Sequence, residues 1–358
     1  MDISRLRRET VESDAPDSDR RDILKAATLV GGAAALFGAM GQQTASAQIT
    51  QVAAPALSDK PWWPHPKWGK DDQAGASNWI TPAKVLDALK SIKDGKIHRV
   101  GRVYESKMPK FGDRTFNIRI TPVTASVGAN RLVGHDEFVA TEIGQTGTQF
   151  DGLGHIGIQM GKDGDLQEVR FYNGVTEFEM TSPYGLLKLG IENCKPIFTR
   201  GHLFDIEALK GKMMEVGEEI KLADVRAAMQ KQGMKEEDIK DGDALFFNTG
   251  FGALWMKNND KFNSGEPGIG LEVAKWLIDK NPCMMGSDCW ATEVVPNPDK
   301  NLIFPVHSEV ITKHGIYNHE NLDFTSLIAD RKYQFAYIFS PAPIRGATGS
   351  NGGPIAVT

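Results

Sequence analysis

The chain has 358 residues, of which 41% are hydrophobic, so it can bury a sizeable core and is not expected to be disordered over most of its length. Lys and Arg number 41 against 46 Asp and Glu, and this net charge of −5, without a block of basic residues, excludes nucleic acid as an expected partner. The three cysteines form no CxxC pair, so a metal would have to use His, carboxylate or amide oxygen ligands.

The first 47 residues have the layout of a signal peptide. Arg20 and Arg21 precede the uncharged stretch 26–40, and the small residues 45–47 form a cleavage pattern before Gln48. The uncharged stretch is shorter than the roughly 20 residues that span a bilayer. The paired arginines resemble the twin-arginine export signal. We therefore expect a periplasmic or secreted protein that loses residues 1–47 and is not associated with a membrane afterwards.

The rest of the chain alternates predicted strands and helices, with no internal repeat and no linker that divides it. We expect an irregular N-terminal arm over 48–80 and one domain over 81–358. Apolar spacing predicts helices over 81–92, 222–232 and 270–280. Apolar runs or alternation predict strands over 97–103, 116–123, 131–142, 196–198, 243–248, 283–286 and 335–339, with a loop at 199–201.

The densest concentration of polar residues and glycines lies at 145–155. Polar side chains recur at the odd positions 145, 149, 151 and 155, so on an extended or turning backbone several of them can converge on one point. A strand with solvent-facing polar residues is the alternative interpretation. Glycines at 147, 152 and 154 argue against it, because they weaken a strand unless the backbone must approach another group closely. The segment is therefore a candidate functional site.

This segment resembles the signature of the cyclase or kynurenine formamidase-like family of metal-dependent hydrolases, His-x-Gly-Thr-His-x-Asp-x-x-x-His. Residues 147, 148, 151 and 155 match the signature, whereas Gln145 and Gln149 stand where the family has its first two histidines. Further collinear similarities cover nearly all of the chain after residue 47, at 68–82, 267–272, 286–290, 305–307, 315–322 and 343–350.

The resemblance implies an α/β fold in a single domain, with a mixed β-sheet core and flanking helices of the swivelling β/β/α kind. It also implies self-association as a homodimer or homotetramer. Transferred residue by residue, the family's site gives His155 as the acid/base residue. It gives as metal-ligand candidates Gln145, Gln149, Asp151, His307 and Glu320.

The two glutamines change the chemistry that the resemblance implies. A carboxamide offers a neutral, harder oxygen in place of an imidazole nitrogen, so selectivity should move from zinc toward manganese, magnesium or calcium. We expect a divalent metal, manganese or zinc, with magnesium or calcium as alternatives. The glutamines can also lie off the metal, and His202 either restores a lost imidazole or is a hydrogen-bonded loop residue.

The expected function is hydrolysis of a small, cyclic or aromatic, amide or lactone, in which metal-bound water attacks the carbonyl and His155 moves the proton. Phe150 and Trp290 are candidate walls of the substrate pocket, and core packing explains them nearly as well. Two alternatives stay open. One is a metal-free cyclase or lyase that uses His155 and Glu320, and the other is a non-catalytic periplasmic protein that binds small molecules. No Gly-x-Ser-x-Gly elbow is present, and Cys289 has no dedicated His partner in sequence.

Overall fold

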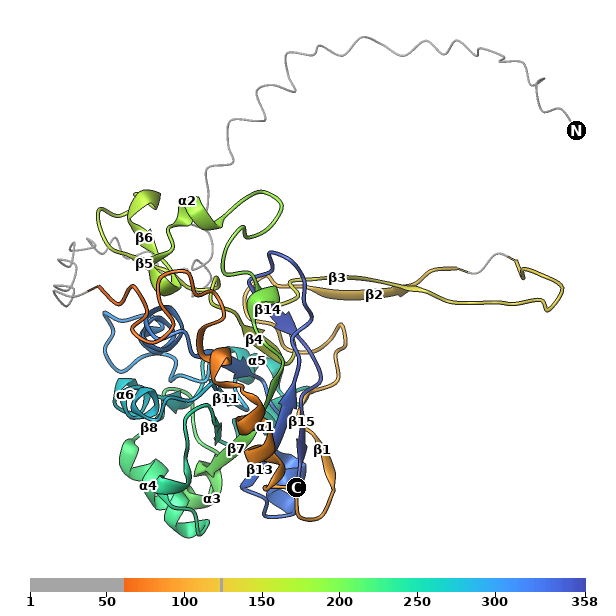
Figure 1. Ribbon diagram of the computed structural model, residues 1–358. Helices are drawn as coiled ribbons and strands as arrows, with labels where there is room; N and C mark the ends of the chain where they lie inside the picture. The colour runs from red at the N-terminus through yellow and green to blue at the C-terminus, as the bar shows by residue number, and fades with distance from the viewer. Residues whose placement is uncertain (1–60, 123–124) are drawn as a thin grey trace, which may run out of the picture. The chain divides into compact units, whose positions relative to one another are not determined.

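A computed structural model describes residues 61–122 and 125–358, so the predicted signal peptide and residues 48–60 of the predicted arm lie outside the described residues. All described residues belong to one compact unit. Its centre is a nine-stranded sheet in the order β1-β15-β13-β7-β9-β11-β12-β4-β14 (Figure 1). The strands are β1 (Ile97–Arg99), β4 (Gln149–Asp151), β7 (Ile197–Asp205), β9 (Ala244–Asn248), β11 (Met284–Ser287), β12 (Tyr317–Glu320), β13 (Gln334–Phe339), β14 (Gly349–Asn351) and β15 (Ile355–Val357).

The sheet is mixed, which confirms the predicted fold class. β7, β9, β11 and β12 pair in parallel, and every other neighbouring pair is antiparallel. Short two-stranded ribbons complete the strands: β2 (Phe116–Ile120) with β3 (Glu137–Thr141), β5 (Ile158–Gln159) with β6 (Val169–Arg170), and β8 (Glu219–Ile220) with β10 (Gly268–Ile269).

The helices are short. They are α1 (Pro82–Leu89), α2 (Glu177–Met180), α3 (Ile206–Lys210), α4 (Leu222–Lys231), α5 (Asn259–Asn263), α6 (Leu271–Asp279), α7 (Pro305–His307) and α8 (Thr325–Ala329), and a π-helical segment, Ser308–Lys313, follows α7. Thr81 caps α1 as predicted, because its side chain accepts a hydrogen bond from the Lys84 backbone N–H. No helix in the described ranges is long and apolar enough to cross a bilayer.

Both faces of the sheet are buried, because successive side chains on a strand point in opposite directions. On β9, Leu245 and Phe247 face the core beneath α4 and α6, which lie side by side in Figure 1. Phe246 faces a second core on the other side of the sheet. That second core is enclosed by the curl of the sheet, since Phe150 of β4 contacts Phe339 of β13 with ring centroids 4.9 Å apart.

The largest difference from the predicted elements is β7. The sequence predicts a strand that ends at residue 198, whereas β7 runs unbroken from Ile197 to Asp205 through the predicted loop at 199–201. A glycine is required at position 201 of β7, because a Cβ there would be 2.4 Å from the ring of Phe335 on the neighbouring β13. This glycine therefore marks a close packing contact rather than a turn. The other predicted strands exist but are shorter at 97–103, 116–123 and 131–142.

Candidate functional site

The candidate site is built on the pairing of β4 with β12. These antiparallel strands place Asn318 opposite Asp151 and Glu320 opposite Gln149. Since side chains alternate across a strand, these four polar side chains share one face of the sheet. All four are buried. Polar side chains from the 145–155 segment therefore lie beside polar side chains of β12, a strand about 170 residues further along the chain.

Three buried side chains converge at the centre of this face. His307, in α7, points its Nε2 atom at Asp151 Oδ2 (3.6 Å) and at Glu320 Oε1 (3.3 Å). Asp151, His307 and Glu320 each offer one ligand atom, and these atoms lie within 4.8 Å of one another. Among the described residues no lysine or arginine pairs with either carboxylate; their ionic partners are histidines.

The donor set fits a divalent cation. Burial and the neighbouring Asp151 carboxylate raise the pKa of Glu320 to about 8. Burial also opposes ionisation of Asp151, but His155, His307 and the Gln145 amide outweigh it and lower the pKa of Asp151 to about 2. Two buried carboxylates at this separation need a proton or a cation between them. Two carboxylates and one imidazole would satisfy such an ion.

Carboxamides surround the two carboxylates. Gln145 Nε2 donates to Asp151 Oδ1 (2.9 Å), and Gln149 Nε2 donates to Glu320 Oε2. Asn318 Nδ2 donates to Asp151 Oδ2 (3.2 Å) and to Glu320 Oε1 (2.5 Å). Gln145 and Gln149 therefore lie beside Asp151 and Glu320, and their role as metal ligands stays a prediction. Their N–H groups contact the outer oxygens of the carboxylates, while the inner oxygens face His307.

His155 lies at the edge of the cluster. Its Nε2 atom is 3.9 Å from Asp151 Oδ1, and its Nδ1 atom is 3.4 Å from the Gln145 amide. Its side chain keeps 19% of its surface exposed, in contrast to the almost wholly buried carboxylates. Burial lowers the pKa of His155 against the opposing effect of Asp151. An imidazole placed beside a charged cluster and open to solvent on one side can exchange protons with a bound molecule.

The glycines of 145–155 are required by close packing. Gly147 has φ +65°, and a Cβ there would be 2.3 Å from the Tyr104 ring. A Cβ on Gly152 would be 2.6 Å from the Thr348 carbonyl oxygen, and the Gly152 N–H donates to that same oxygen (2.9 Å). The glycines thus let the segment pass close to the strands that support it, as their number in the sequence indicates.

Phe150 is not a wall of the site, contrary to its sequence interpretation as a pocket residue. It is wholly buried, and its ring stacks on Tyr317 with centroids 5.0 Å apart on the face of the sheet opposite Asp151. Trp290 is 7% exposed and stacks on Phe111. Trp290 reaches the site only indirectly, through Phe304, which contacts the His307 ring edge to face.

His202 does not restore a missing imidazole. Its Nε2 atom is 2.8 Å from Asp243 Oδ2, in a buried network that also includes Lys84 and lies outside the carboxylate cluster. His319 lies on the face of β12 away from Glu320, with its Nδ1 atom 2.8 Å from the Tyr337 hydroxyl. Burial lowers the pKa of His319 to about 3. Cys289 is fully buried, and its pKa is raised well above the ordinary value by burial, which removes it as a nucleophile.

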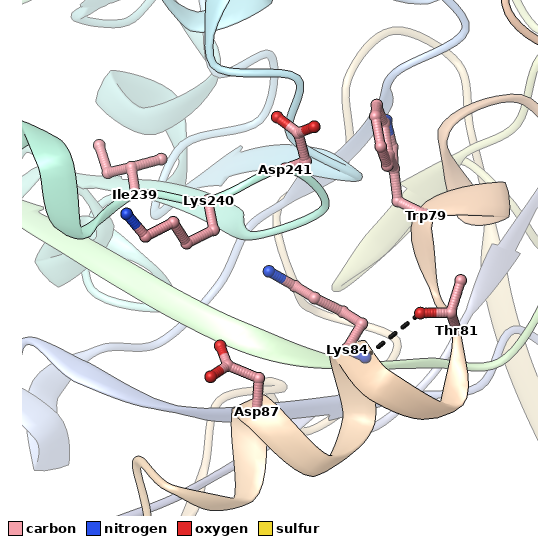
Figure 2. A pocket seen from close by; sticks show the side chains of 7 residues that line it. All are labelled: Trp79, Thr81, Lys84, Asp87, Ile239, Lys240 and Asp241. Atoms are coloured by element: carbon pink, nitrogen blue, oxygen red, sulfur yellow. Dashed lines mark hydrogen bonds between the residues drawn. The ribbon is translucent and has the colours of Figure 1, made fainter.

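A separate cavity of about 610 Å³ lies beside α1, and its lining residues are drawn in Figure 2. Lys84 lines it, but the Lys84 ammonium is paired with the buried Asp243. None of the lining residues belongs to the carboxylate cluster. The polar groups of this region therefore serve the packing of α1 on the sheet.

Sequence reasoning missed two residues of the site. Asn318 could have been found, because it lies two residues before Glu320 on a strand and so shares its face. Glu293 could not, because it comes from a loop after β11. Its carboxylate accepts hydrogen bonds from the backbone N–H of His307 (2.9 Å) and from His307 Nδ1 (2.5 Å).

The protein is therefore an α/β protein with a curled, mixed nine-stranded sheet. It carries a buried candidate metal site formed by Asp151, His307 and Glu320. The family model described as "Putative cyclase" matches residues 101–294. The chain belongs to this cyclase family, which confirms the family assignment made from the sequence.

Solved structures of similar proteins share this fold. A crystal structure of a novel cyclase is 30% identical, with a TM-score of 0.72 over 82% of this chain and 96% of that one. Isatin hydrolase A from Ralstonia solanacearum is 17% identical, with a TM-score of 0.53 over 78% of this chain and 99% of that one. Isatin hydrolase A from Labrenzia aggregata, bound to benzyl benzoate, is 15% identical, with a TM-score of 0.52 over 76% of this chain and 97% of that one. These two show a shared fold. No curated protein matches the chain.

Proposed function

We propose that this protein is a metal-dependent hydrolase that opens a small, cyclic or aromatic, amide or lactone. The observation that carries the proposal is the convergence of Asp151, His307 and Glu320 in a buried cluster without a lysine or arginine partner among the described residues. Membership of the cyclase family supports it, and so does the fold shared with proteins named isatin hydrolases.

Asp151, His307 and Glu320 would hold the cation. A divalent ion supplies Lewis acidity and lowers the pKa of a water that it binds. Two carboxylates and one imidazole suit manganese or zinc, and the oxygen-rich surroundings leave magnesium and calcium as alternatives. Gln145 orients Asp151 through its amide N–H, and Gln149 does the same for Glu320.

His155 would serve as the acid/base residue. Among the described residues it is the histidine at the edge of the cluster with an exposed part, so its ring can reach a bound substrate while Gln145 and Asp151 hold its position. A proton taken up at His155 can be returned to the leaving group when the carbon–nitrogen or carbon–oxygen bond breaks.

The test is His155→Ala. We expect turnover of a panel of cyclic amides and lactones to fall by at least about 100-fold, because a general acid–base group is lost. Metal content, measured by elemental analysis of natively purified protein, should stay unchanged, since His155 is not a ligand. The exposed His135 gives a matched control, and His135→Ala should keep full activity. Full activity in His155→Ala would remove His155 from the mechanism.

A metal-free reaction is the second candidate, and the carboxamides favour it. Three amide N–H groups already contact Asp151 and Glu320, so the cluster can satisfy its carboxylates without a cation. His155 and Glu320 would then carry out an elimination or cyclisation. Wild-type protein that is active and free of metal after native purification would select this candidate.

We also propose that the protein self-associates. The hairpin 116–141, formed by β2 and β3, has apolar side chains that remain 42–56% exposed on both faces, among them Ile118, Ile120, Phe138 and Val139. An isolated two-stranded ribbon is marginally stable in water. Elsewhere the chain exposes further large apolar side chains, among them Phe178 at 64%, Tyr184 at 98% and Leu187 at 69%. A second copy of the chain would cover such surfaces.

Export remains a proposal that rests on residues 1–47 of the sequence. The paired arginines, the uncharged stretch 26–40 and the cleavage pattern before Gln48 support it. N-terminal sequencing of the protein from its native host should find Gln48 as the first residue, and an intact Met1 would contradict export by this route.

A further inference from the structure

Glu293 is a buried residue whose carboxylate, among the described residues, forms its hydrogen bonds with the short helix α7. It is wholly buried, in a loop that runs beside β10 through a bridge with Ile269. Its Oε1 atom accepts from the backbone N–H of His307 (2.9 Å), and its Oε2 atom accepts from the backbone N–H of Val306 (3.0 Å). Burying a carboxylate is costly unless it is paired and hydrogen-bonded. Among the described residues its ionic partner is the His307 ring, at 2.5 Å from Nδ1.

This contact selects which nitrogen of His307 faces the site. Both oxygens of Glu293 already accept backbone N–H groups, from Val306 and His307, so in the contact with the ring Nδ1 is the donor and carries the hydrogen. In the neutral ring the lone pair is then on Nε2, the atom that faces Asp151 and Glu320. The backbone contacts to Val306 and His307 fix the carboxylate against the same turn that carries the ring, so ring orientation and tautomer are set together.

We propose that Glu293 is a positioning residue, which holds the His307 ring so that Nε2 is presented to a divalent cation shared with Asp151 and Glu320. This role rests on the proposed metal-dependent function. It acts through His307, since Glu293 touches neither Asp151 nor Glu320 in the hydrogen bonds of the site. The orientation of a metal-binding histidine by a carboxylate on its second nitrogen strengthens the ligand and fixes its tautomer.

The chain offers a matched control for the replacement of a buried glutamate side chain by glutamine. Glu266 is also wholly buried and close enough to Glu320 for their charges to interact. It accepts two backbone N–H groups, from Trp290 (2.7 Å) and Ala291 (2.9 Å), without contacting His307. Glu266→Gln therefore replaces a buried carboxyl group that has comparable backbone contacts, and leaves the Glu293 contact with the His307 ring in place.

The experiment measures affinity for Mn²⁺ in full-length protein after chelation and dialysis, from the electron paramagnetic resonance signal of the free ion. We expect Glu293→Gln to weaken binding by about 10- to 100-fold, as for other partners of metal-binding histidines. Glu266→Gln should weaken it by less than about threefold, because Glu293 still holds the His307 ring in this variant. Equal affinity in wild type and Glu293→Gln, or equal losses in the two variants, would overturn the role of Glu293 alone. A wild-type protein that binds no divalent ion would overturn the metal-dependent function as well.

A second measurement needs no variant, so it still decides if Glu293→Gln fails to fold. Nitrogen-15 spectra of the histidines in the Zn²⁺-loaded wild type should show His307 with a protonated Nδ1 and a metal-bound Nε2. A His307 that is bound through Nδ1, or that carries its proton on Nε2, would contradict the proposal.

Discussion

At the scale of single residues, the alternation of side chains along β4 decides which of the residues singled out in the sequence face the carboxylate cluster and which face the core. The odd positions Gln149 and Asp151 share a face, as their spacing predicts. The same rule places Phe150 on the opposite face, where it packs against Tyr317, so its interpretation as a pocket wall was wrong. Asn318 follows from Glu320 by this rule. Glu293 does not, because only the folded loop brings it to His307.

We predict that the two carboxamides, Gln145 and Gln149, influence which metal the proposed site prefers. In the double variant Gln145→His/Gln149→His, imidazole nitrogens replace amides beside Asp151 and Glu320. We expect the affinity for Zn²⁺ relative to Mg²⁺ to rise by at least about tenfold, because zinc prefers nitrogen to neutral oxygen more strongly than magnesium does. Competition titrations measure the ratio.

Gln167→His adds an imidazole at an exposed position away from the cluster and should leave the Zn²⁺ to Mg²⁺ ratio unchanged. A double variant with the wild-type ratio would show that neither position 145 nor position 149 approaches the ion.

At the scale of elements, β7 shows why polar residues in a strand misled the prediction. Thr199 donates to the Gly242 carbonyl oxygen (2.6 Å), and His202 contacts Asp243 (2.8 Å). Thr199 and His202 are thus satisfied by the segment that leads into β9, whereas Arg200 pairs with Asp87 of α1. Helices α4 and α6, whose apolar spacing is regular, were predicted to within one residue at each end. The local pattern of apolar and polar residues does not show that a buried polar side chain has a hydrogen-bond partner in another segment.

Asp243 ties α1 to β7 and provides the second prediction. Its carboxylate accepts from Lys84 and contacts His202, and both are buried with it. Asp243→Asn should lower the free energy of unfolding at pH 7 by about 3 kcal/mol, because the Lys84 charge stays buried without a counter-ion. Urea unfolding measures the loss. The exposed Asp241, replaced by Asn, should change stability by less than about 0.5 kcal/mol.

The pH dependence of this loss has a definite sign. Burial alone would raise the pKa of Asp243, but His202 and Lys84 outweigh it and lower the pKa below its ordinary value of 3.8. The stabilisation is therefore fully present above pH 3.8 and disappears as the pH falls through the lower, folded-state pKa. The difference between wild type and Asp243→Asn should shrink below pH 3.8. A difference that stays constant between pH 7 and pH 3 would show that the Asp243 charge is not its source.

At the scale of the whole molecule, the fold class and family were predictable because collinear motifs extend along most of the chain. The strand order was not, because it depends on contacts between segments far apart in sequence, such as β4 with β12 and β14. The hairpin 116–141 was predicted as two strands, but its exposure on both faces is a tertiary property that neither strand reveals alone.

Self-association through this hairpin is the third prediction. Ile118 and Ile120 lie on one face of β2, and threonine at both positions keeps the preference for a strand while removing apolar surface. Light scattering of the wild type should give a dimer or tetramer, and the double variant should shift toward the monomer at equal concentration. Ile97→Thr changes an exposed isoleucine of β1, outside the hairpin, and should leave the mass unchanged. A monomeric wild type would contradict self-association.

The pairing of β4 with β12 and β14 also governs when the site can form. β4 ends at Asp151, yet both of its sheet partners, which begin at Tyr317 and Gly349, are synthesised much later. During synthesis about 170 further residues must be added after Asp151 before β12 begins to exist, and about 200 before β14 does. The candidate metal site can thus assemble only late in folding, and a chain released before Glu320 would carry Asp151 without the two residues that complete the proposed ligand set.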